Sequence, residues 1–186
     1  MSFYRSYQKA NDIMAQYSYT LVYGTQAIPI GTHAIEINNA SFNYPIIIGN
    51  QVVNCENMLA NCTSFNQPLY FHNNVHIFNN MLRNCRNFNQ DIHFENRPVW
   101  LAFMLADCPN FGGNIYADNI YAANVHGLFL NKNVAKRVNI FTGYFSSGSL
   151  NNIVGGGNNV INSWTTNSIC KYNTAYNIYI YNNYTG

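Results

Sequence analysis

Charged residues are scarce in this chain of 186 residues, because Asp, Glu, Lys and Arg together make up only 9% of it. A soluble domain usually carries about 25% charged residues. The nine basic side chains form no run of the kind that nucleic-acid binding needs. The net charge of +2 therefore favours an ordinary solvated surface over a phosphate-binding stripe.

The sequence also lacks a recognisable targeting segment and a long apolar run. The charged stretch from Met1 to Lys9 is not followed by the apolar region of a signal peptide. No window approaches the length of a membrane-spanning helix, and there is no lipidation motif. We therefore expect a protein that is made and folded in a cytoplasm and is not inserted into a membrane.

Groups that could carry catalysis or bind a metal are few. The seven acids offer little choice for a pair of opposed carboxylates. Cys55 and Cys62 are too far apart for a short-spaced zinc pair, and no acid accompanies His72 and His76. The odd number of cysteines favours free structural thiols over a disulfide framework. We expect no enzyme, no cofactor and no metal site.

Asparagine and aromatic residues are abundant instead, with 34 Asn, 15 Tyr and 12 Phe. Disordered chains lack aromatics, so this composition is not typical of disorder. It suits stacked β structure, in which Asn side chains pair in ladders along the stacking axis. An AT-rich genome would also raise Asn, Tyr and Phe, but it would raise Lys as well, and Lys is scarce here.

A 23-residue repeat organises the middle of the chain. Residues of the same kind return three times without a gap, and Phe42 stands one step before the first Phe. Two weaker units flank the three clear ones, so that five units span residues 35–141, with degenerate outer units as expected of caps. The expected repeat core consists of Phe42; Met58, Leu59, Cys62, Phe65 and Leu69; Met81, Leu82, Cys85, Phe88 and Ile92; and Met104, Leu105, Cys108, Phe111 and Ile115.

Two kinds of local pattern alternate within each unit. Residues 69–71, 92–94 and 115–117 alternate in the manner of short half-buried strands, which would stack in parallel one unit apart. Apolar residues in 75–84 and 99–107 recur at helical spacing and predict short helices on the opposite side. The expected fold is an α/β repeat solenoid of leucine-rich-repeat type that becomes mostly β towards the C-terminus.

The repeat resembles the BspA-like leucine-rich repeat of bacterial surface lipoproteins and of some bacteriophage structural proteins. The matching stretches run from Asn57-Met58-Leu59 to Phe65-Asn66-Gln67-Pro68-Leu69 and from Asn80-Met81-Leu82 to Phe88-Asn89-Gln90-Asp91-Ile92. The resemblance covers over half of the chain. It implies binding or adhesion and brings no catalytic residues with it. Since no export signal is seen, the resemblance favours the particle-bound members of the family over the surface lipoproteins.

The two ends lie outside the repeat. Residues 1–34 are expected to form an arm, with a short helix or irregular segment before a strand at 18–23, that caps the solenoid or docks on a partner. Residues 142–186 form a Gly-, Asn- and Tyr-rich β-type segment whose last strand, 177–181, alternates Ile with Tyr. Tyrosine is enriched at interfaces, and a final strand leaves an edge open to pairing. The candidate interface residues are Tyr4, Tyr7, Tyr176, Tyr179, Tyr181 and Tyr184.

These features together predict a non-enzymatic structural or binding module. The first hypothesis is a bacteriophage virion component, such as a tail, fibre or capsid-associated protein, that contacts other structural proteins or further copies of itself. The alternatives are an adhesin for a host receptor or carbohydrate, and a cytoplasmic repeat scaffold. No nucleic-acid partner is expected.

Overall fold

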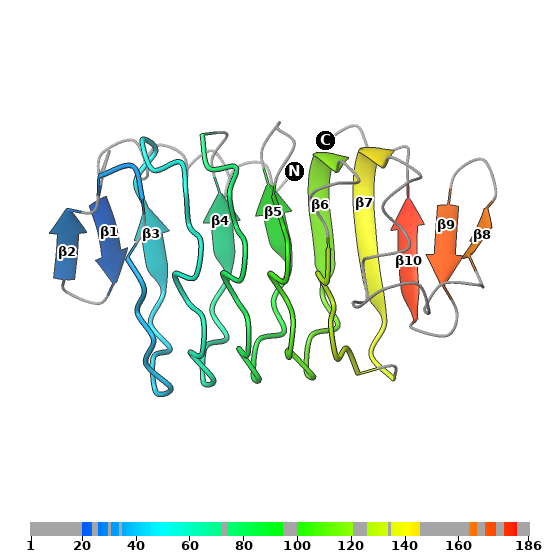
Figure 1. The fold of residues 1–186 in the computed structure, drawn as a ribbon, viewed down its shortest axis with the longest axis horizontal. Helices are drawn as coiled ribbons and strands as arrows, with labels where there is room; N and C mark the ends of the chain where they lie inside the picture. Colours follow the sequence, from blue (N-terminus) through cyan, green and yellow to red (C-terminus); the bar gives the residue numbers. More distant parts are fainter. Residues whose placement is uncertain are drawn as a thin grey trace, which may run out of the picture.

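The computed structural model describes residues 20–23, 26–29, 31–33, 35–71, 74–94, 100–120, 126–133, 135–145, 164–166, 170–173 and 177–181. This part of the chain is mostly β, and its strands lie side by side in one long row (Figure 1). The strands are β1 (Thr20–Tyr23), β2 (Gln26–Pro29), β3 (Ile46–Ile48), β4 (Leu69–Phe71), β5 (Ile92–Phe94), β6 (Asn114–Ile120), β7 (Val138–Phe145), β8 (Trp164–Thr166), β9 (Cys170–Asn173) and β10 (Ile178–Tyr181).

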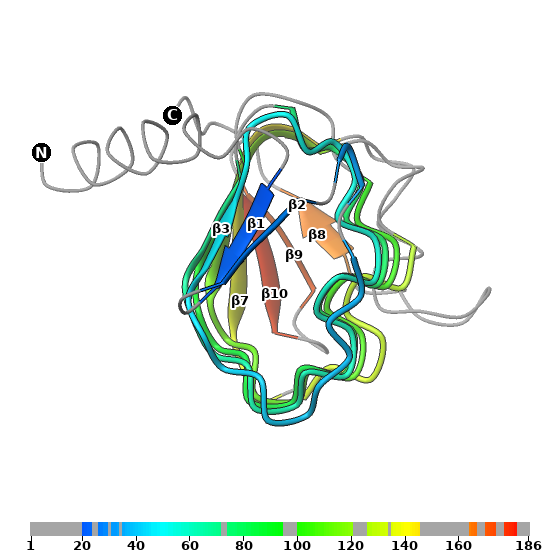
Figure 2. The same ribbon diagram turned by 90° about the vertical axis from the view of Figure 1, so that its left-hand side faces the viewer.

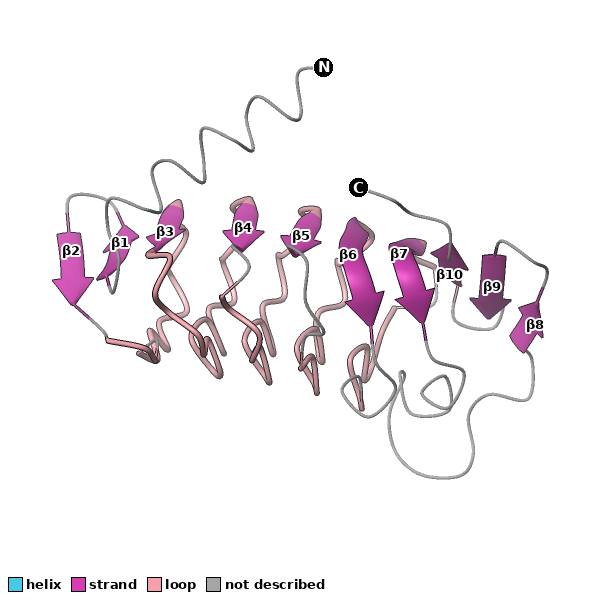
Figure 3. Ribbon diagram, turned by 90° about the horizontal axis from the view of Figure 1, so that it is seen from above, coloured by secondary structure: helices cyan, strands magenta, loops and turns pink. Residues whose placement is uncertain are grey.

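A parallel sheet of five strands, β4, β5, β6, β7 and β10, is the centre of the molecule. Its register follows the repeat, because Leu69 pairs with Ile92, Ile92 with Ile115, and Ile115 with Ile140. Each repeat thus contributes one coil to a stack. Viewed along the stack, the coils superimpose, with the strands on one side and turns on the other (Figure 2). The strands form one edge of the molecule and loops the other when it is seen from above (Figure 3).

Antiparallel hairpins lie at both ends of the row. At the start, β1 pairs with β2 and with β3, which lies one repeat before β4 in the chain. At the other end, β9 pairs with β8 and with β10. Strand β10 itself pairs in parallel with β7, with Ile178 opposite Val138. The parallel stack is therefore followed at each end by a change to antiparallel pairing.

The expected helices are absent from the described residues, so the prediction of an α/β repeat was wrong on this point. The stretches 75–84 and 100–107 form consecutive turns instead. Among the described residues, the structure has no helix long and apolar enough to cross a membrane.

Left-handed residues explain why these stretches turn. Asn57 and Asn61 have φ angles of 57° and 63°, and their counterparts Asn80 and Asn84 have φ angles of 55° and 61°. Each occupies the third position of a turn such as 55–58, in which the Met58 N–H donates to the Cys55 carbonyl at 3.2 Å. A positive φ at this position is the mark of a type II turn and cannot occur within an α-helix.

The other N–H groups of the turns point to the next coil. The Leu59 N–H donates to the Met81 carbonyl at 2.9 Å, and the Leu82 N–H donates to the Met104 carbonyl at 3.0 Å. In a helix these N–H groups would bond four residues back along the same segment. The polar backbone is thus satisfied between coils, which gives a column of turns where helices were expected.

The interior between the sheet and the turns is filled by columns of identical side chains. The rings of Phe42, Phe65, Phe88 and Phe111 stack at centroid distances of 5.8 to 6.0 Å. Phe129 continues this column at 6.2 Å from Phe111, although it is out of phase with the repeat. All the residues that the sequence assigned to the repeat core are buried in this interior.

Candidate binding surfaces

The outer face of the parallel sheet carries a column of aromatic side chains. Because strand residues alternate between faces, the neighbours of the buried residues Ile92, Ile115 and Ile140 point outward. These neighbours form a stack in which His93 lies 4.4 Å from Tyr116, Tyr116 lies 5.0 Å from Phe141, and Phe141 lies 4.9 Å from Tyr181, measured between ring centroids. Tyr70 holds the same position on β4, opposite His93. We call Tyr70, His93, Tyr116, Phe141 and Tyr181 the aromatic stripe.

The rings of the stripe lie face to face. The three stacked pairs have interplanar angles of 4° to 12°. Each inner ring therefore has its two faces against neighbours in the stack and presents its edge outward. His93 is 9% exposed, and the tyrosines and Phe141 are half-buried. The stripe is a ribbon of ring edges and hydroxyl groups rather than a set of open ring faces.

Arg137 anchors the C-terminal end of the stripe. Its guanidinium carbon lies 4.0 Å from the centroid of the Tyr179 ring, an arrangement that attracts the cation to the π face. One terminal nitrogen donates to the Tyr181 hydroxyl at 3.0 Å, and Nε donates to Asn139 Oδ1 at 2.9 Å. One side chain thereby connects β10 with the strand beside it.

The titration of His93 depends on its position in the stripe. Burial lowers the pKa of this imidazole, and the Asp91 carboxylate partly opposes the shift. The neutral ring is therefore favoured near neutral pH, as a ring stacked on Tyr116 requires no counter-ion.

The tyrosines proposed as an interface are only partly within the described residues. Tyr179 and Tyr181 lie on the outer face of β10, with Ile178 and Ile180 buried on the other face. Tyr4, Tyr7, Tyr176 and Tyr184 lie outside the described residues, as do the arm at 3–15 and the short strands expected between 153 and 161.

Most of the stripe was missed as a candidate interface. The signal was present, since Tyr70, His93 and Tyr116 recur at the 23-residue phase one position after the core residues Leu69, Ile92 and Ile115. Phe141 and Tyr181 could not be found in this way, because the register of β7 and β10 departs from the repeat length.

The cysteines form a packing column and not a reactive site. The Cys85 thiol donates to the Leu59 carbonyl oxygen at 3.1 Å, and the Cys108 thiol donates to the Leu82 carbonyl oxygen at 3.0 Å. Burial raises the pKa of Cys108 to about 12, so that the nucleophilic thiolate is disfavoured. Among the described residues, no three His, Cys, Asp or Glu side chains gather as metal ligands would.

Lys132 is a buried cation with a structural environment. Its ammonium group donates to the backbone carbonyls of Asn133 and Lys136 and so closes a loop after the last turn of the column. Burial lowers its pKa to about 8. Its bonds to backbone carbonyls indicate that it holds this loop together.

Comparisons with known proteins are limited to one family. Residues 36–117 match the family described as "Mycoplasma protein of unknown function, DUF285". This range contains the three clear repeat units and ends within β6. No curated protein and no solved structure matches the chain.

Proposed function

We propose that this chain is a non-enzymatic binding and assembly module that docks a protein partner on the outer face of its sheet. The observation that supports this most directly is the aromatic stripe, which runs across β4, β5, β6, β7 and β10. Tyr, Phe and Arg are enriched in protein interfaces, and Lys and Glu are depleted. The stripe and Arg137 have this composition.

The geometry of the stripe favours a protein over a sugar as its partner on this face. A sugar stacks on an open aromatic face, but the inner rings of the stripe face one another. The ring edges and tyrosine hydroxyls instead offer a flat, partly apolar ribbon with hydrogen-bonding groups at intervals. Such a surface suits the side chains of another folded protein.

In its specific form, the proposal is a leucine-rich-repeat relative of the BspA-like kind that serves as a bacteriophage virion component. The low charge, the Asn- and Tyr-rich composition and the repeat motif support this form. Mass spectrometry of density-purified, salt-washed particles from the source tests it. A fixed copy number relative to a major capsid protein is expected. Absence from the particles would leave the adhesin and the cytoplasmic scaffold as the forms to pursue.

Cross-linking from single positions tests the docking surface directly. A photoreactive phenylalanine analogue placed at Tyr116, on the stripe, is expected to capture a partner in source cells. The same analogue at Asn110, which is exposed in a loop on the opposite side of the coil, is the matched control and should capture none. Capture from Asn110 with none from Tyr116 would contradict docking on the sheet.

A further inference from the structure

A groove runs across the turn column on the side of the coils opposite to the sheet (Figure 2). Its volume is about 740 Å³, and its lining side chains come from five successive coils. The groove is lined mainly by amide and charged side chains. It is therefore distinct from the aromatic stripe in both place and chemistry.

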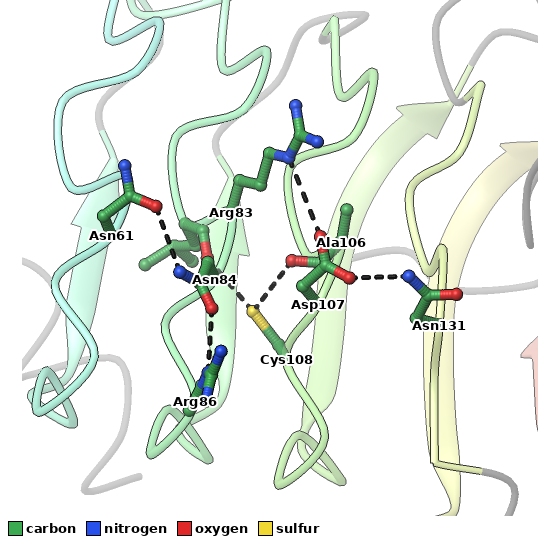
Figure 4. A network of polar contacts seen from close by, with 9 residues as sticks. Asn61, Arg83, Asn84, Arg86, Ala106, Asp107, Cys108 and Asn131 are labelled. Carbon is green, nitrogen blue, oxygen red and sulfur yellow. Dashed lines mark hydrogen bonds and ion pairs between the residues drawn. The ribbon is translucent and has the colours of Figure 1, made fainter.

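A row of polar side chains at the repeat phase follows the groove: Asn38, Asn61, Asn84, Asp107 and Asn131. Within this row the Asn61 amide donates to Asn38 Oδ1 at 3.3 Å, and the Asn84 amide donates to Asn61 Oδ1 at 3.0 Å (Figure 4). Each of these –NH₂ groups has two N–H donors and uses only one in the ladder. The second donor and a further lone pair of each amide remain for a ligand.

The row is rigid before any ligand binds. All five residues have positive φ angles, between 43° and 63°, which fix the direction in which each side chain leaves the backbone. The ladder bonds then fix the orientation of the amide groups. Polar groups held in this way lose little entropy when they bind a ligand.

Two arginines set the charge of the groove. Nε of Arg83 lies 3.7 Å from Asp107 Oδ2 in the next coil, and Asp107 Oδ1 accepts from the Asn131 amide at 2.6 Å (Figure 4). The Asp107 carboxylate is thus compensated. Exposed Arg86 donates through Nε to Asn84 Oδ1 at 3.0 Å, and no acid pairs with it among the residues that the structure describes. Its terminal nitrogens form a fork suited to a carboxylate.

We infer that this groove binds a linear acidic polysaccharide, with sugar hydroxyls on the amide row and a uronate carboxylate on Arg86. The spacing of the coils supports this ligand class. Neighbouring parallel strands lie about 4.8 Å apart, so five coils present a row about 19 Å long. An equatorially linked pyranose advances by a similar distance per unit, whereas an extended peptide advances only about 3.3 Å per residue. A sugar chain can therefore repeat its contacts from coil to coil.

Calorimetry with the full chain tests this inference. The probes are hexasaccharides of hyaluronan and of β-1,4-linked mannuronate, with cellohexaose as a neutral chain and hexaglutamate as an acidic peptide. At least one acidic hexasaccharide is expected to bind about tenfold more tightly than cellohexaose, as the loss of one charge-assisted pair implies. Hexaglutamate is expected to bind no better than cellohexaose.

Two substitutions locate the site. Arg86→Ala should weaken binding of the acidic hexasaccharide about tenfold, and Arg86→Lys should weaken it less, because the charge is kept and the fork is lost. Arg137→Ala is the matched control, since it removes the same charge on the sheet side, and it should leave binding unchanged. The inference is overturned if neither acidic hexasaccharide binds, if hexaglutamate binds equally well, or if Arg137→Ala weakens binding as much as Arg86→Ala.

Discussion

The sheet side and the turn side of the coils are both stacked ladders, but they are closed to different degrees. On the sheet side, each inner ring of the aromatic stripe has its faces against its neighbours. On the turn side, each amide of the row uses only part of its hydrogen-bonding capacity on the next coil. The comparison teaches that a ladder of rings leaves a surface of edges, while a ladder of amides leaves donors and acceptors free to bind a polar ligand.

The two sides also contribute differently to stability. Both rest on the same apolar interior, whose burial is the main driving force for folding. The hydrogen bonds of the ladders add a modest net amount each. We therefore expect changes in the interior to cost most, changes in the turn column less, and changes in the stripe least.

Removal of one ring from the interior is expected to have the largest effect. The ring of Phe88 is fully buried and stacks on Phe65 at 5.9 Å and on Phe111 at 5.8 Å. Phe88→Ala should lower the free energy of unfolding by about 3–5 kcal/mol, measured by urea denaturation. Asn87→Ala, at an exposed position beside it, is the control and should change the stability little.

Two substitutions of Asn61 separate backbone from side chain in the turn column. Asn61→Ala loses both the ladder bonds and a side chain that tolerates a φ of 63°, and should cost about 2 kcal/mol. Asn61→Gly keeps the conformation accessible and loses only the bonds, so about 1 kcal/mol is expected. Equal losses in urea denaturation would show that the left-handed conformation does not matter.

A buried thiol should make the turn side sensitive to alkali. Cys85→Ala removes the bond to the Leu59 carbonyl and should cost about 1 kcal/mol at pH 7. Burial raises the pKa of Cys85 in the folded state, while an unfolded thiol ionises near pH 8.5. The stabilising contribution of the neutral thiol is therefore complete below that pH and declines as the pH rises. The native chain should lose more stability than Cys85→Ala between pH 8 and 10.5.

The smallest expected effect concerns acid and the stripe. Burial lowers the pKa of His93 in the folded state, so its contribution to stability is present above the unfolded pKa of about 6.5 and is lost as the pH falls. His93→Tyr places the residue of Tyr70 and Tyr116 at this position and keeps the stack. Its melting temperature should fall less than that of the native chain between pH 7.5 and 5. An equal fall in both chains would show that another group causes the acid sensitivity.

The strands of the clear repeat units could be predicted, because one buried side chain on each side of an outward residue leaves a plain alternation. Strands β4 and β5 coincide with the expected 69–71 and 92–94, and β6 begins one residue before the expected 115. The last strand also shows the predicted alternation of Ile178 and Ile180 with tyrosines.

The turn column could not be predicted from apolar spacing alone. Met81 and Leu82 are both buried, as a helix facing the core would also allow. The distinguishing signal was Asn80 and Asn84, since Asn tolerates a positive φ better than most residues. That signal was obscured by the abundance of Asn throughout the chain.

Departures from the repeat length explain the remaining differences. Gly127 and Asn131 take the left-handed positions one residue later than the 23-residue phase predicts, and a side chain at Gly127 would clash with the Phe103 ring. Strand β10 takes its place beside β7 from far along the chain. Such substitutions depend on three-dimensional contacts and leave no periodic trace in the sequence.

Hydroxyl-radical footprinting of the chain in its natural complex, compared with the isolated chain, tests the docking proposal most directly. Oxidation of Tyr116, Phe141 and Tyr181 should fall in the complex, because the partner covers the outer face of the sheet. Oxidation of Pro109, on the turn side, should stay unchanged. Protection of Pro109 with unchanged oxidation of the three aromatic residues would contradict the proposal.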